Sequence, residues 1–207
     1  MSPRRYRSVR RAAAAEETRE RIVAAAVSVL SATGEAPAFS LESVAAAAGV
    51  TRLTVYNQFG SRRALLECAF DKLAERGGLF RIGEVMGGPD ALSALTQIVA
   101  VFCDFWGRHG GAARRLLDAT VRDEELRESL NARQERRRQV MATLVGRLAR
   151  SGQVAPDAVR DVVDVLFVLT SVEVFLALKT GKRSTAAVCR LIQALAANVI
   201  GRAHPRE

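Results

Sequence analysis

Residues 40–65 read SLESVAAAAGVTRLTVYNQFGSRRAL and predict two short helices joined by a tight turn, followed by the start of a third helix. Ala45 is small where two helices must cross closely, and Gly49 can adopt the positive φ of a sharp turn without steric cost. Val55 is an apolar anchor that would hold the second helix against the first. Helix–turn–helix units have this construction, and their second helix is free to enter the major groove of DNA.

The composition favours a helical protein with an anionic partner. Apolar residues make up 49% of the 207 residues and aromatic residues only 5%, which favours helices over strands. The net charge of +9 points first to nucleic acid and second to an anionic membrane surface. An arginine-rich composition without functional meaning would give the same charge, so the charge alone does not decide.

The longest apolar stretch, residues 162–178, contains Asp164 and Glu173, which a membrane span would have to bury. We therefore expect a cytoplasmic protein without a membrane segment. Three scattered cysteines suit reduced thiols in such a compartment. Two histidines cannot form a metal cluster with those cysteines, and no phosphate-binding glycine loop follows a strand, so we expect no enzyme activity, no cofactor and no metal.

The chain as a whole predicts an all-α fold of about nine helices in two domains. Residues 1–11 hold five arginines and no acid, which indicates a flexible basic arm. Residues 12–76 form the helix–turn–helix domain together with a connecting fourth helix, and the glycine-rich residues 77–89 are the expected linker. Residues 90–207 form the second domain, with helices expected at 90–108, 112–121, 124–150, 157–180 and 184–202.

The continuation of the opening stretch resembles the DNA-binding domain of the TetR family of bacterial transcriptional regulators. That family has a tyrosine, two further residues, a phenylalanine, a small-residue turn, a basic residue and a leucine. In this sequence those places are filled by Tyr56, Phe59, Ser61, Arg62 and Leu65. The sequence departs from the family at two positions: Arg62 replaces the usual lysine, and Leu53 stands where a small residue is usual.

The resemblance implies that the helix over residues 52–59 reads DNA. Arg52 suits a guanine and Asn57 an adenine, while Ser40, Tyr56 and Arg62 suit phosphates. Thr51 could instead be only a helix cap, Tyr56 half core and Asn57 merely solvated. The expected DNA-binding residues are Ser40, Thr51, Arg52, Leu53, Thr54, Tyr56, Asn57 and Arg62, with Arg4 and Arg5 of the arm.

The resemblance also implies that the second domain binds a small molecule and forms a homodimer through the helices near 157–180 and 184–202. These helices could instead form a monomer's own core. The expected ligand is hydrophobic, and the candidate residues are Phe102, Phe105, Trp106, His109, Met141, Phe167, Ser171 and Phe175, although the aromatic ones could equally be core. A basic cluster on one helix is either a solvated face or a site for an anionic effector; its members are Arg133, Arg136, Arg137 and Arg138.

The function that these inferences imply is a repressor of transcription released from a palindromic operator by a small hydrophobic ligand. The alternative is a dimeric DNA-binding regulator without a small-molecule ligand, controlled by a partner protein.

Overall fold

The computed structural model describes residues 3–32, 39–121 and 123–204, and this part of the chain is helical without strands, which confirms the predicted all-α fold. Ten α-helices and one 3₁₀ turn lie in the described residues, one α-helix more than expected. The chain divides into two compact units, Met1–Leu73 and Ala74–Glu207, and each has its own buried apolar residues.

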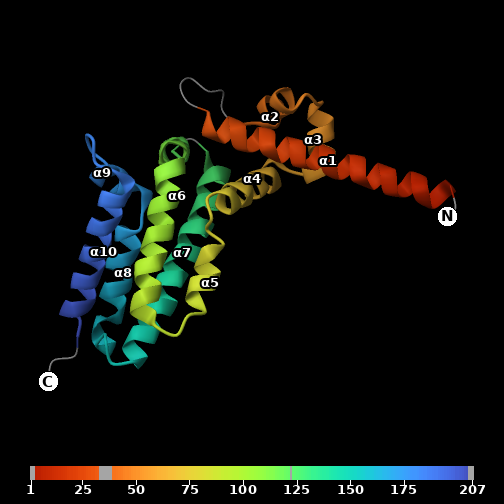
Figure 1. Ribbon diagram of the computed structural model, residues 1–207. Helices are drawn as coiled ribbons and strands as arrows, with labels where there is room; N and C mark the ends of the chain where they lie inside the picture. Colours follow the sequence, from red (N-terminus) through yellow and green to blue (C-terminus); the bar gives the residue numbers. More distant parts are fainter. Residues whose placement is uncertain (1–2, 33–38, 122, 205–207) are drawn as a thin grey trace. The chain divides into compact units, whose positions relative to one another are not determined.

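The N-terminal unit is built from α1 (Pro3–Ser31), α2 (Leu41–Ala48), α3 (Arg52–Phe59) and most of α4 (Arg62–Arg76). Helix α1 packs against α2, and α2 packs against α3, as the red and orange ribbons of Figure 1 show. The fully buried side chains of this unit that are larger than alanine come from all four helices: Ile22, Val44, Val55, Leu65 and Leu66. The predicted helix–turn–helix is therefore present.

The turn between α2 and α3 depends on one glycine. Gly49 ends α2 with φ 65°, a left-handed conformation that glycine adopts without penalty. The amide of the next residue, Val50, donates to the carbonyl of Ala45 at 3.0 Å, which closes the end of α2. Val55 has no exposed surface, as expected of the residue that anchors α3.

The expected flexible arm differs from the structure, because α1 begins at Pro3 and residues 3–11 have a helical backbone. Proline suits the first turn of a helix, where its missing amide hydrogen would have no intrahelical partner. The alanines that follow, residues 12–15, have the highest helix propensity of any residue type. These local preferences continue the helix outward from the core.

The C-terminal unit is a bundle of four long helices with shorter ones against it. These are α5 (Arg81–Met86), α6 (Ala91–Ala119), α7 (Glu124–Arg150), the 3₁₀ turn η1 (Pro156–Ala158), α8 (Val159–Leu169), α9 (Val172–Leu178) and α10 (Thr185–Arg202). Helix α6 packs against α7 and α10, and α8 packs against the same two helices, which closes the bundle (Figure 1). Helices α5 and α9 both lie against α6.

The segment expected as a glycine-rich linker, residues 77–89, contains helix α5 and belongs to the C-terminal unit. Its apolar residues Ile82 and Val85 pack against the core. Arg147 of α7 donates to the carbonyls of Met86 at 2.8 Å and Pro89 at 3.1 Å. Glycines before, within and after a short helix produced the composition of a linker.

Two expected helix boundaries in this unit are corrected. Helix α6 continues through Gly110 and Gly111, where we expected a break. A Cβ on Gly110 would lie 3.1 Å from Leu176 of α9, so this glycine permits close packing rather than ending the helix. Conversely, the single helix expected over 157–180 is interrupted at Thr170, and the side chain of Ser171 caps α9.

Candidate nucleic-acid interface and ligand cavity

Helix α3 exposes one face and buries the other. Val55 and Phe59 point into the core, whereas Leu53 is 66% and Tyr56 is 54% exposed. Arg52 and Asn57 are also exposed. Positions 52, 53, 56 and 57 repeat at a spacing of four, so these side chains share one helix face. The structure therefore presents four of the predicted DNA-binding residues together on an accessible helix.

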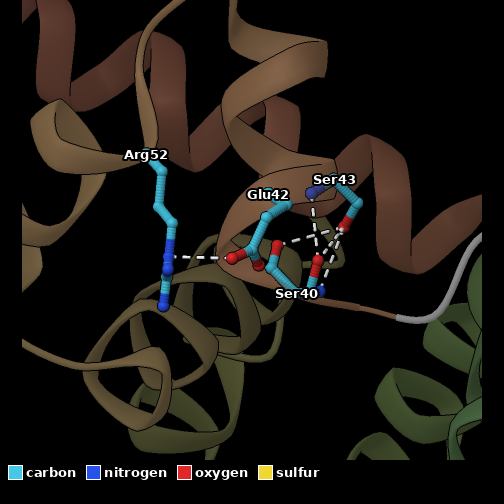
Figure 2. A network of polar contacts seen from close by, with 4 residues as sticks. All are labelled: Ser40, Glu42, Ser43 and Arg52. Carbon is cyan, nitrogen blue, oxygen red and sulfur yellow. Dashed lines mark hydrogen bonds and ion pairs between the residues drawn. The ribbon is translucent and has the colours of Figure 1, made fainter.

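Arg52 forms an ion pair that the sequence did not predict. Its Nε atom lies 2.8 Å from Oε1 of Glu42, in the first turn of α2 (Figure 2). Both side chains remain more than half exposed. The pair holds the guanidinium of the expected base-reading residue beside α2 without removing it from solvent.

Ser40 and Thr51 cap the two helices of the motif. The Ser43 amide donates to Ser40 Oγ and the Ser40 amide donates to Ser43 Oγ, each at 3.0 Å, which forms a capping box at the start of α2 (Figure 2). At the start of α3 the Thr54 amide donates to Thr51 Oγ1 at 3.1 Å. The hydroxyls of Thr51 and Thr54 also lie 2.9 Å apart.

Arg62 and Arg63 lie in the first turn of α4, which contains no acidic residue. Cations are unfavourable at the positive end of a helix dipole, whereas an anion there is stabilised. Arg62 Nε donates to the Phe39 carbonyl at 3.1 Å, and its guanidinium lies 5.5 Å from the Phe39 ring centroid. Arg62 thus holds the residue before the α2 cap, in addition to any phosphate contact.

Sequence reasoning missed Arg19 of α1 as a residue that positions α3. Its Nη1 donates to the Gln58 carbonyl at 2.7 Å, and its guanidinium lies over the Phe59 ring at 4.3 Å. Its Nη2 contacts the Cys68 sulfur at 3.5 Å. The only sequence feature that could have indicated this role is the position of Arg19 next to the apolar stripe of the first helix. Arg4 and Arg5, the expected arm contacts, lie in the first turns of α1, and their side chains fall outside the described part.

The C-terminal unit contains a cavity of about 400 Å³, which opens to solvent between α6, α7, α8 and α9. This volume lies within the range of small-molecule sites. Its lining combines aliphatic, aromatic and polar side chains: Leu117, Thr120, Arg127, Leu130, Asn131, Gln134, Arg137, Phe167, Val168, Ser171 and Glu173. Phe167 and Ser171 are the two predicted ligand-binding residues among them.

The other predicted ligand-binding residues lie elsewhere in the unit. Phe102, Met141 and Phe175 are buried in the bundle core, and Phe105 is also buried. Trp106 donates its indole hydrogen to the Thr170 carbonyl at 3.0 Å. The His109 ring packs 5.1 Å from that of Phe105, and burial followed by the charges of Arg108 and Arg76 lowers the pKa of His109. Phe102, Phe105 and Phe175 are therefore buried in the unit, and none of these six predicted residues lines the cavity described above.

In the described residues, no helix is long and apolar enough to cross a membrane. Over the same residues, histidine, cysteine and acidic side chains form no group of three that could hold a metal ion.

Comparison with known proteins agrees with this architecture. Residues 22–69 match the family model of bacterial regulatory proteins of the tetR family. No curated protein sequence matches the chain. Among solved structures, one from Rhodococcus sp., provisionally assigned as a TetR-family transcriptional regulator, has 21% identity and a TM-score of 0.66 over 89% of this chain and 99% of its own.

Two further structures share the fold. A protein from Mesorhizobium loti MAFF303099, also provisionally assigned as a TetR-family regulator, has 15% identity and a TM-score of 0.68, covering 92% of this chain and 98% of its own. A TetR family transcriptional regulator from Chloroflexus aurantiacus J-10-fl has 16% identity and a TM-score of 0.54, covering 93% of this chain and 95% of its own.

The N-terminal unit presents an exposed helix after a glycine turn, which is the construction of a helix–turn–helix DNA-binding domain. The residues that match the family model, 22–69, contain this helix–turn–helix. These findings support the TetR family of bacterial transcriptional regulators: residues 22–69 match its family model, and the chain shares the fold of solved TetR-family structures.

Proposed function

We propose that the protein is a homodimeric repressor that binds a palindromic operator and is released from it by a small molecule held in the C-terminal unit. The observation that carries the proposal is the exposed face of α3, where Arg52, Leu53, Tyr56 and Asn57 are accessible beside the arginines at the start of α4.

The DNA contacts divide into two kinds. Arg52 and Asn57 carry the donors and acceptors that pair with guanine and adenine edges in the major groove. Tyr56, Arg62 and the amides at the start of α2 suit phosphate oxygens, which fix the register of the protein on the duplex. Leu53 is large and 66% exposed, and it suits the methyl group of a thymine.

A homodimer is supported by apolar surface on α8 and α10. Val165 and Val168 of α8 are 39% and 53% exposed, and Leu195 of α10 is 38% exposed. Exposed apolar side chains on two neighbouring helices suit burial against the same surface of a second copy. A two-fold dimer would place two recognition helices about one helical turn of DNA apart, which matches a palindromic site.

Release by a ligand is supported by the cavity among α6, α7, α8 and α9. A ligand that binds better to one dimer arrangement shifts the population toward that arrangement. In this proposal the favoured arrangement no longer matches the spacing of the operator half-sites.

The DNA part is tested by selecting bound fragments from random duplexes and measuring their affinity by fluorescence anisotropy. Arg52→Ala should cost about 1–3 kcal/mol on the selected site and relax the preference at one base pair of each half-site. Arg62→Gln should weaken binding to every sequence and reduce the slope of log K against log salt by about one. If both variants bind the selected duplex as tightly as wild type, the orientation of α3 is not the one proposed.

The dimer is tested by light scattering on the full chain. Val165→Asp and Leu195→Asp should shift the mass from dimer toward monomer, whereas Gln139→Glu on the exposed side of α7 should not. A wild-type monomer would contradict the homodimer. A dimer that no compound stabilises or releases from DNA would favour control by a partner protein instead.

A further inference from the structure

Arg137 of α7 is a buried cation with only neutral partners. Arg137 is only 7% exposed. Its Nη1 donates to the Phe167 carbonyl at 2.7 Å and to Thr170 Oγ1 at 3.1 Å, and both Nε and Nη2 donate to Gln134 Oε1. Among the described residues no carboxylate lies within ion-pair distance of this guanidinium.

The surroundings keep Arg137 charged and in place. Its guanidinium stacks on the Phe167 ring at 4.1 Å. Burial lowers the pKa of Arg137 to about 10, while the more distant charge of Glu173 raises it and that of Arg138 lowers it. The side chain is therefore still a cation at neutral pH. A buried cation without an anion is costly, and a bound anion would reduce that cost.

The guanidinium also borders the cavity. Arg137, Gln134 and Phe167 all line it, and four of the five guanidinium hydrogens are used by the bonds above. The remaining Nη2 hydrogen has no partner in the described residues. A planar carboxylate entering the cavity could accept it, because guanidinium groups suit carboxylate geometry.

We propose that this cavity binds an amphipathic organic carboxylate, with the carboxylate at Arg137 and the apolar part against Leu117, Leu130 and Phe167. The inference rests on the proposed function, because it names the chemical class of the molecule that releases the DNA. It replaces the expectation of a purely hydrophobic ligand. The negative Glu173 on the cavity rim opposes the carboxylate and limits its affinity.

The test is direct binding without DNA, using matched probes that differ only in charge. Straight-chain carboxylates of six to twelve carbons and 4-phenylbutyrate form the anionic set, and the corresponding amides and amines form the neutral and cationic sets. Binding is followed by isothermal calorimetry and by the fluorescence of Trp106, the single tryptophan of the chain. Its indole donates to the carbonyl of Thr170, whose hydroxyl accepts from Arg137.

At least one carboxylate should bind more tightly than its own amide and amine by about tenfold or more, which corresponds to one charge-assisted interaction of about 1.4 kcal/mol. If amides or amines bind as well as the carboxylates, or if no carboxylate binds at millimolar concentration, the proposal is overturned. This comparison needs no variant, so a folding defect cannot obscure it.

Variants then test whether Arg137 and Glu173 determine the preference for carboxylates. Arg137→Met should abolish the preference for carboxylate over amide, and Glu173→Gln should increase carboxylate affinity by a few-fold. Arg136→Gln, on the exposed side of the same helix, should change neither. If Arg137→Met does not fold, Glu173→Gln alone decides: unchanged carboxylate affinity in that variant contradicts a carboxylate in this cavity.

DNA release is measured separately, by adding the tightest carboxylate to the protein on its selected duplex. A carboxylate that binds at Arg137 but leaves the complex intact supports the site and contradicts release by ligand. If an amide releases the protein from DNA and the protein shows no preference for carboxylates, the result supports the proposed function and overturns the assignment of an anionic ligand.

Discussion

Glu42 of α2 and Arg52 of α3 are joined by an ion pair, with 2.8 Å between Oε1 and Nε, although the side chains are 60% and 68% exposed. An exposed pair of this kind contributes only about 0.2–1 kcal/mol to folding. Its main consequence therefore concerns DNA, because Arg52 cannot keep this geometry and also make a bidentate contact to guanine through Nε. In the proposed orientation of α3, Glu42 would therefore compete with the operator for the same cation.

We predict that Glu42→Gln increases affinity for DNA by up to about fivefold, because the competing carboxylate is removed and the available energy is about 1 kcal/mol. Fluorescence anisotropy on the selected duplex and on an unrelated duplex would measure this. Asp157→Asn, in the C-terminal unit, controls for the same change in net charge. Weaker binding by Glu42→Gln would instead mean that Glu42 orients Arg52 toward the base.

Ser40 has a structural role that can be separated from its expected contact with phosphate. Ser40→Ala removes the N-cap of α2 and should lower the free energy of unfolding by about 1 kcal/mol. Ser40→Asp keeps a side-chain acceptor at the N-cap, so stability should be retained, but its charge should repel phosphate and weaken DNA binding. Chemical denaturation and anisotropy on both variants give the two values. Tight DNA binding by Ser40→Asp would exclude a phosphate at this position.

Two helical glycines should respond oppositely to alanine. At Gly146 of α7 a Cβ would meet only the flexible end of Arg150, at 3.6 Å, so Gly146→Ala should stabilise the protein by about 0.5–1 kcal/mol. At Gly107 of α6 the Cβ would lie 3.0 Å from both γ atoms of Thr185, a side chain that cannot turn away without bringing the other γ atom closer. In Gly107→Ala the steric clash should therefore outweigh the gain in helix propensity, and the variant should be less stable than wild type. Thermal unfolding of both variants is the measurement, and a higher Tm for Gly107→Ala would contradict the packing described.

His109 predicts a pH dependence of stability. Burial, Arg108 and Arg76 lower its pKa below the ordinary value of 6.5, so the unfolded chain binds a proton that the folded chain resists. The stability that comes from the neutral ring is present above pH 6.5 and is lost as the pH falls through the lowered pKa. Between pH 7.5 and 5.5 the Tm of wild type should fall further than that of His109→Gln. Parallel Tm curves would show that the ring titrates normally.

The helix–turn–helix could be predicted closely from sequence because its signals are local. The N-cap at Ser40, the left-handed turn at Gly49 and the apolar anchor at Val55 each act within a few residues. Composition was less reliable in the C-terminal unit. Gly110 looked like a helix end but makes room for Leu176, and the polar pair Thr170-Ser171 was not interpreted as a break within the mostly apolar residues 162–178.

Sequence reasoning missed Arg19 and named Arg137 only as one of four arginines in a basic cluster, because both residues act through contacts between distant parts of the chain. Arg19 reaches Gln58 and Phe59, which lie 39 and 40 positions away, and Arg137 reaches Thr170, 33 positions away. Arg137 looked the same as its neighbours in a run of arginines. Only the packing of α7 against α8 shows that it is the buried one.

The continuity of α6 has a mechanical consequence. From Leu117 at the cavity to Ala91 beside α5 the helix is unbroken, a length of about 39 Å at 1.5 Å per residue. A stiff rod of this length works as a lever: a tilt of about 5° at the cavity end displaces the other end by about 3 Å. Had the two glycines at 110 and 111 formed a joint, the same tilt would have been absorbed within a few residues of the cavity.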